Sequence, residues 1–142
     1  METYTVKKTI SIYAPINKVF EALTDSEQVI QYYPLEEVVS DWRVGSEIIA
    51  EGSIEGQRFT DYGKIDSLIP NQEFQYTYWS TNHGTERTPE NYLTICYTLS
   101  ETDKGTVLNL EQKNIKSKQM YSQMLEIWDF LLLNLKSFVE PK

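Results

Sequence analysis

The stretch Ser117–Glu140, SKQMYSQMLEIWDFLLLNLKSFVE, decides the fold of this chain. Its apolar residues recur every three or four positions, which is the period of an amphipathic helix. The stripe consists of Met120, Met124, Ile127, Leu131, Leu135 and Phe138, widened by Trp128 and Leu132. Ser117 suits the N-cap and Pro141 follows the end. The spacing therefore predicts one long helix whose stripe is buried, with charged side chains such as Lys136 turned to water.

The residues before this helix alternate between apolar and polar, as half-buried strands do. We expect strands at 3–13, 47–54, 57–69, 73–80, 90–100 and 105–114, and a weak edge strand around Val38 and Val39. Two short helices are predicted after the first strand, at 15–23 and 26–31, because Pro15 suits a first helical turn and Asp25 suits an N-cap. This order predicts an α+β fold in which a curved antiparallel sheet of six to seven strands packs around the long helix.

Length and charge limit the classes of partner. The 142 residues fit a single domain, 1–142. The net charge is −8, and from Lys18 to Asp66 there are eleven acidic side chains against four basic ones. Such a surface repels polyphosphates and anionic bilayers, so we expect no nucleic-acid partner and no membrane partner. No apolar run approaches the roughly 18 residues of a membrane span, and we expect a cytoplasmic protein. The oligomeric state is left open.

The residues that usually hold cofactors are scarce. One histidine, His83, and one cysteine, Cys96, give no spaced pair of metal ligands, so we expect no metal. No glycine-rich loop leads from a strand into a helix, which disfavours a nucleotide cofactor. His83 lies in a polar loop and is expected to be exposed, whereas Cys96 lies in a strand and is expected to be a small buried residue. We predict no catalytic residue from these patterns.

Two polar side chains are predicted to point into the molecule. Asp61 shares one side of its strand with Phe59 and Ile65 if these face inward. A buried aspartate has a raised pKa and could act as a general base, or it could accept hydrogen bonds from neighbouring groups. Gln112 shares a strand face with Leu110 and could orient a ligand carbonyl.

Aromatic residues give the stronger functional signal. Tyr76 and Tyr78 share one strand face, Trp79 lies on the other, and Trp128 comes from the long helix. Tyrosine and tryptophan side chains around an interior space favour a largely apolar pocket with a few polar groups. The predicted cavity residues are Tyr32, Tyr33, Trp42, Phe59, Asp61, Tyr76, Tyr78, Gln112, Met124, Trp128 and Leu131.

The chain also resembles a known family. The matching residues are APINKVF at 14–20 with ALT at 22–24, WRVGS at 42–46, DYGKI at 61–65 with Pro70, and Trp128. In these residues and in the order of its elements, the chain resembles the START-like SRPBCC superfamily and, within it, the bacterial relatives of the Hsp90 ATPase activator domain. The resemblance implies a helix-grip fold, START or Bet v 1-like, with the sheet curled around the last helix.

Three functions are compatible with this resemblance. The first is binding of a hydrophobic or aromatic small molecule, lipid-like or polycyclic, by a carrier or sensor. The second is a protein-interaction module, with a chaperone or another protein as partner, and a role in stress response. The third is a cyclase or hydrolase that uses a buried acid such as Asp61.

Overall fold

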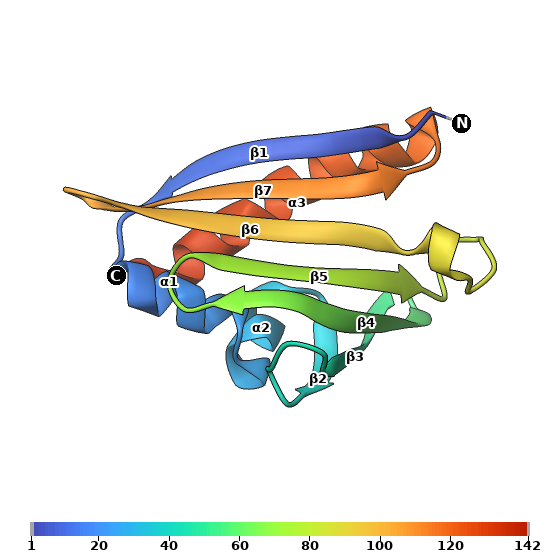
Figure 1. Ribbon diagram of the computed structural model, residues 1–142, viewed down its shortest axis with the longest axis horizontal. Coiled ribbons are helices and arrows are strands. Elements are labelled where there is room, and N and C mark those ends of the chain that lie inside the picture. The colour runs from blue at the N-terminus through green and yellow to red at the C-terminus, as the bar shows by residue number, and fades with distance from the viewer. Residues whose placement is uncertain (1, 142) are drawn as a thin grey trace.

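The computed structural model describes residues 2–141, and its elements follow the predicted order (Figure 1). They are β1 (Tyr4–Ile12), α1 (Ile16–Leu23), α2 (Ser26–Tyr32), β2 (Leu35–Ser40), β3 (Glu47–Ile54), β4 (Gln57–Ile69), β5 (Glu73–Ser80), a 3₁₀ turn (Pro89–Asn91), β6 (Leu93–Thr102), β7 (Gly105–Ile115) and α3 (Lys118–Val139). The predicted α+β helix-grip fold is confirmed.

A single antiparallel sheet of seven strands forms one layer of the molecule, in the order β1-β7-β6-β5-β4-β3-β2. Each strand from β2 to β7 pairs with its neighbour in sequence, whereas β1 crosses to the other end of the sheet and pairs with β7. The β3–β4 turn contains Glu55 and Gly56, whose φ angles of 50° and 82° lie in the left-handed region. Two such residues in a row suit a tight hairpin turn.

The long helix α3 lies behind the sheet in Figure 1 and packs on one of its faces. It is continuous, and the Ser117 hydroxyl accepts a hydrogen bond from the Met120 amide at 3.1 Å, so the predicted cap is confirmed. Figure 1 shows α1 and α2 at one end of this arrangement, between β1 and the opposite edge strand β2. The Asp25 carboxylate caps α2 by accepting from the Glu27 amide at 3.0 Å.

The buried stripe of α3 differs from the predicted one. The helix buries Trp128, Leu131, Leu132, Leu135 and Val139. Ile127 and Phe138 were predicted to be buried, but they are 44% and 37% exposed. The buried stripe is therefore narrower than predicted and is shifted toward its Trp128 side, away from Ile127 and Phe138.

Lys136 on the same helix does not extend into water as predicted. Its ammonium donates to the Ser11 carbonyl at 2.8 Å and lies 4.2 Å from the centre of the Tyr13 ring. These contacts connect the last turns of α3 to the end of β1.

Cys96 also departs from its prediction. Along β6 the buried side chains are Leu93, Ile95, Tyr97 and Leu99, so Cys96 points to the opposite, outer face and is only half-buried. The predicted alternation of this strand is correct, but Cys96 occupies one of the positions whose side chains face away from the core.

Candidate functional site

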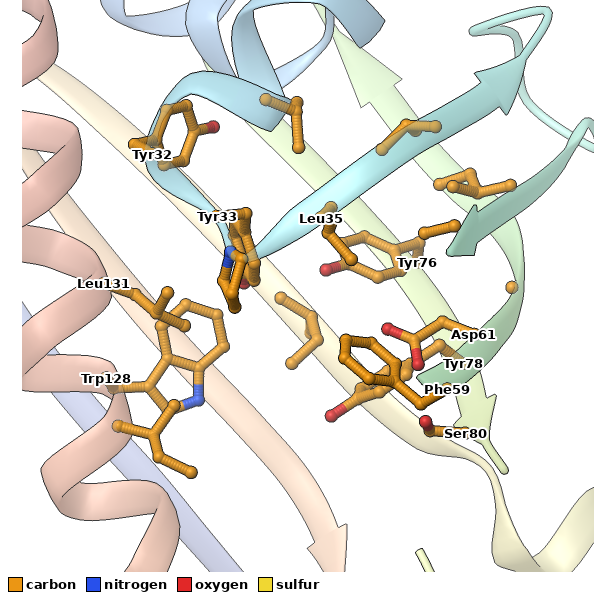
Figure 2. A pocket seen from close by; sticks show the side chains of 18 of the residues that line it. Tyr32, Tyr33, Leu35, Phe59, Asp61, Tyr76, Tyr78, Ser80, Trp128 and Leu131 are labelled. Carbon is orange, nitrogen blue, oxygen red and sulfur yellow. The ribbon is translucent and has the colours of Figure 1, made fainter. Parts of the chain in front are cut away.

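A cavity of about 450 Å³ lies between α3, the α2–β2 segment and the inner face of β3 to β6. Its volume is within the usual range for small-molecule sites. The wall is made mostly of aliphatic and aromatic side chains, and Figure 2 shows residues from the helices and from the sheet facing one another across it. Among the described residues that line the cavity, none is a lysine or an arginine.

The structure places all the predicted cavity residues on this wall except Gln112. Gln112 is fully buried beneath the wall, where its amide nitrogen donates to the Tyr78 hydroxyl at 3.1 Å. Its amide oxygen accepts from the Trp128 indole at 2.8 Å. Both ends of the amide bond to protein groups and Gln112 does not line the cavity, so its suggested role in orienting a ligand carbonyl stays a prediction.

Aromatic rings form the part of the wall between the sheet and α3. Phe74 and Tyr97 stack with ring centres 6.1 Å apart, and the Tyr33 ring meets Trp128 edge-on at 6.3 Å. Burial raises the pKa of Tyr33 and Tyr76 well above the ordinary tyrosine value. These phenols therefore stay neutral and present apolar rings to the cavity, with the Tyr33 hydroxyl 3.4 Å from that of Tyr97.

The Trp42 ring belongs to the same wall. Its indole nitrogen donates to the Ser26 hydroxyl at 3.0 Å, which connects the loop after β2 to the start of α2. Its ring lies 5.9 Å from that of Phe74. Two of the three tryptophans, Trp42 and Trp128, thus line the cavity, whereas Trp79 stacks on Tyr62 on the outer face of the sheet.

Asp61 provides the negative charge of the cavity wall. Its pKa is raised from 3.8 to about 6, because burial penalises the carboxylate more than the neighbouring Ser80 hydroxyl stabilises it. Figure 2 shows Asp61 and Ser80 on the sheet side, across the cavity from Trp128 and Leu131. The Oδ1 atom of Asp61 is buried and has no hydrogen-bond partner among residues 2–141.

His83 is a cavity residue that the sequence analysis placed in an exposed loop. It lies in the turn after β5, three residues beyond Ser80, and its Nδ1 accepts a hydrogen bond from the Ser80 amide at 3.3 Å. Its ring meets Tyr78 edge-on with centres 5.3 Å apart. Burial lowers the pKa of His83 to about 4, so the imidazole is neutral near pH 7. The sequence does contain an indication that His83 is close to the cavity. The turn that carries it begins at Ser80, which shares a strand face with Tyr76 and Tyr78.

The rim of the cavity includes exposed apolar side chains of α3. Ile127 and Phe130 both line the cavity and are 44% and 62% exposed. The next apolar residue along this side, Leu133, is 59% exposed. The opening is therefore bordered by hydrophobic surface on the helix side.

The structure also bears on metal binding and on membrane crossing. Within residues 2–141, no three histidine, cysteine or acidic side chains come together as metal ligands would. None of the described helices combines the length and the hydropathy that crossing a bilayer requires.

Comparison with known proteins gives one family and several solved structures. The sequence model of the family described as "Activator of Hsp90 ATPase homolog 1-like protein" matches residues 13–140. No significant match was found among curated proteins.

Three solved structures show the same fold. ChR145 from Cytophaga hutchinsonii is 33% identical, with a TM-score of 0.83 over 97% of this chain and 95% of that one. The Aha1 dimer from Colwellia psychrerythraea is 21% identical, with a TM-score of 0.79 over 96% of each chain. CalU16 from Micromonospora echinospora is 23% identical, with a TM-score of 0.69 over 98% of this chain and 76% of that one. The last two support the fold alone.

Proposed function

This chain belongs to the family of Activator of Hsp90 ATPase homolog 1-like proteins, and from that premise we propose that it binds a hydrophobic or aromatic small molecule in its internal cavity, as a carrier or a sensor. The ligand would be lipid-like or polycyclic, because the wall it meets is aliphatic and aromatic.

The observation that carries this proposal is the cavity itself. Protein interiors are normally packed with few voids larger than a water molecule. Here about 450 Å³ lies open between the sheet and α3, although Trp128 and Tyr97 on its wall are almost completely buried. An apolar space of this size gains favourable contacts when an apolar molecule fills it.

Tryptophan emission can report such binding, since Trp42 and Trp128 line the cavity and Trp79 does not. We expect a saturable change in emission when a polycyclic aromatic probe such as phenanthrene, or a decyl-chain compound, is titrated into the protein. The Trp79→Phe variant keeps both cavity indoles and should retain the full change. The double variant Trp42→Phe with Trp128→Phe keeps only the outer indole and should show none.

A second measurement separates binding from the optical signal. Native mass spectrometry of freshly purified protein should detect a co-purifying small mass, and calorimetric titration should give one site per chain. A complete absence of saturable binding across the probes, in a protein that melts cooperatively, would contradict the proposal.

A protein-interaction role has two supporting observations and is the second candidate. Phe130 and Leu133 expose apolar surface on the outer side of α3, and a structural neighbour, the Colwellia psychrerythraea Aha1, is described as a dimer. On this reading a second copy of the chain covers that surface. Light scattering should then show that the unchanged protein is a dimer. The double variant Phe130→Ser with Leu133→Ser should be a monomer. If the unchanged protein is already a monomer, this candidate is excluded.

The third reading, a cyclase or hydrolase, depends on Asp61. The raised pKa of Asp61 suits a general base, and His83 lies nearby as a neutral group in the same wall. No second acid faces Asp61 among the residues that line the cavity. Enzymatic use of Asp61 therefore stays a prediction.

A further inference from the structure

Asp61 is the polar feature of the cavity that the protein itself leaves unsatisfied. Its Oδ1 is buried with no donor among residues 2–141, whereas its strand partner Ser80 lies beside the carboxylate. A buried acceptor without a partner destabilises the fold, and more so when it is charged. Native proteins rarely keep such an atom without a reason connected to a ligand, a water molecule or catalysis.

The surroundings of Asp61 offer no positive charge. The described lining residues include no lysine or arginine, and His83 is neutral near pH 7 because burial lowers its pKa to about 4. Tyr76 and Tyr78 have pKa values raised further by the nearby Asp61 charge. The polar end of the cavity is therefore electronegative, and a ligand carboxylate placed there would face an anion of the same sign.

We propose that the cavity selects apolar molecules that carry a hydrogen-bond donor, an amine or a hydroxyl group, and that it discriminates against carboxylates. This inference rests on the proposed ligand binding and specifies the polar group of the ligand. The donor pairs with the carboxylate of Asp61, which lines the cavity, and the apolar body extends toward Trp128 and Leu131 on α3, which Figure 2 shows on the opposite side of the cavity.

The energetic argument favours donors over acids for two reasons. A hydrogen bond to a charged acceptor contributes about 1.5–3 kcal/mol, which corresponds to about tenfold or more in affinity. The desolvation of Asp61 is already part of the folded state, since its carboxylate is buried before any ligand enters. A fatty acid makes no such bond and adds the repulsion between two carboxylates.

Three compounds with the same alkyl chain isolate the contribution of the polar group. Decylamine, decanol and decanoate are titrated calorimetrically, below their aggregation limits and near neutral pH, into the unchanged protein, Asp61→Asn and Asp66→Asn. Asp66 lies on the same strand but is exposed, so its variant removes the same charge without altering the cavity. We expect decylamine and decanol to bind about tenfold more tightly than decanoate in the unchanged protein and in Asp66→Asn.

In Asp61→Asn the preference should fall to about threefold or less, because the amide is neutral and can itself donate to a carboxylate. Equal affinities of the unchanged protein for all three compounds would overturn the inference and leave the proposed binding function intact. A donor preference that persists in Asp61→Asn would also overturn it. If no compound binds at all, the proposed function fails together with the inference.

Discussion

At the scale of single residues, Asp61 reduces the stability of the fold. A carboxyl group whose pKa is raised from 3.8 to about 6 on folding binds more protons in the folded state than in the unfolded state between those pH values. Raising the pH through this window therefore lowers the free energy of unfolding. The opposite sign applies to His83, whose lowered pKa makes stability rise with pH as the unfolded histidine loses its proton.

The Asp61→Asn variant should consequently be more stable than the unchanged protein near neutral pH. We expect a gain on the order of 2 kcal/mol in the free energy of unfolding, which should shrink toward zero at about pH 3, below the pKa of Asp61 in both states. Urea unfolding followed by circular dichroism at a series of pH values measures both quantities. Asp66→Asn is the matched control, and a variant at Asp61 that is less stable at every pH would contradict this interpretation.

Ten predicted residues line the cavity, and four of them, Phe59, Asp61, Tyr76 and Tyr78, follow from strand alternation. Asp61 lies on the inner face with Phe59, as period-two spacing requires. His83 escaped prediction because its position depends on a turn in which the Ser80 amide bonds its Nδ1. Gln112 was placed inside correctly, but the sequence carries no information that Tyr78 and Trp128 occupy both ends of its amide.

At the scale of secondary-structure elements, Gln112 joins three of them. It lies on β7, donates to Tyr78 on β5 and accepts from Trp128 on α3. This bridge connects the helix to the sheet beneath the cavity.

Replacing Gln112 by methionine keeps the volume but removes both hydrogen bonds. We expect a loss of about 2–4 kcal/mol in unfolding free energy, because the Trp128 indole N–H and the Tyr78 hydroxyl lose their partner. Gln75→Met, on the outer face of β5, is the control and should change stability by no more than about 0.5 kcal/mol. In a double-mutant cycle, Trp128→Phe should cost less in the Gln112→Met background than alone, and strictly additive losses would show that the bridge has no energetic role.

The orientation of α3 about its own axis shows what a sequence pattern cannot predict about a helix. The helix was predicted correctly in its extent, but Ile127, Phe130 and Leu133 make its exposed side apolar as well. When apolar residues occupy more than one face, the periodicity no longer identifies the buried one. The face of the helix that is buried then depends on specific contacts, such as the hydrogen bond from the Trp128 indole to Gln112.

At the scale of the whole molecule, the architecture was predictable because the sheet is built largely from neighbouring strands. The strands β2 to β7 pair in sequence order, and turn residues such as Gly56 mark the hairpins. The volume of the cavity was not predictable. Whether side chains such as Phe74 and Tyr97 fill the space under a helix depends on their three-dimensional packing, which the alternation of apolar and polar residues does not specify.

The open interior also determines how the molecule responds to hydrostatic pressure. Unfolding eliminates internal voids, so a folded protein with a large void occupies more volume than its unfolded chain, and pressure favours the smaller state. The cavity opens at its rim, but its wall is mostly apolar and apolar cavities stay dry, so we expect its volume of about 450 Å³ to act as a void. Unfolding under pressure should then show a volume decrease toward the upper end of the usual range, about 20–100 mL/mol.

The Ala50→Phe variant tests this expectation, because Ala50 lines the cavity while its neighbour Ile49 points to the outer face. High-pressure fluorescence should show a smaller volume decrease for Ala50→Phe and an unchanged one for Ile49→Phe. An unaltered value for Ala50→Phe would mean that the space is not void in solution. A bound ligand should act as the phenylalanine does, so that a loaded protein would resist compression better than an empty one.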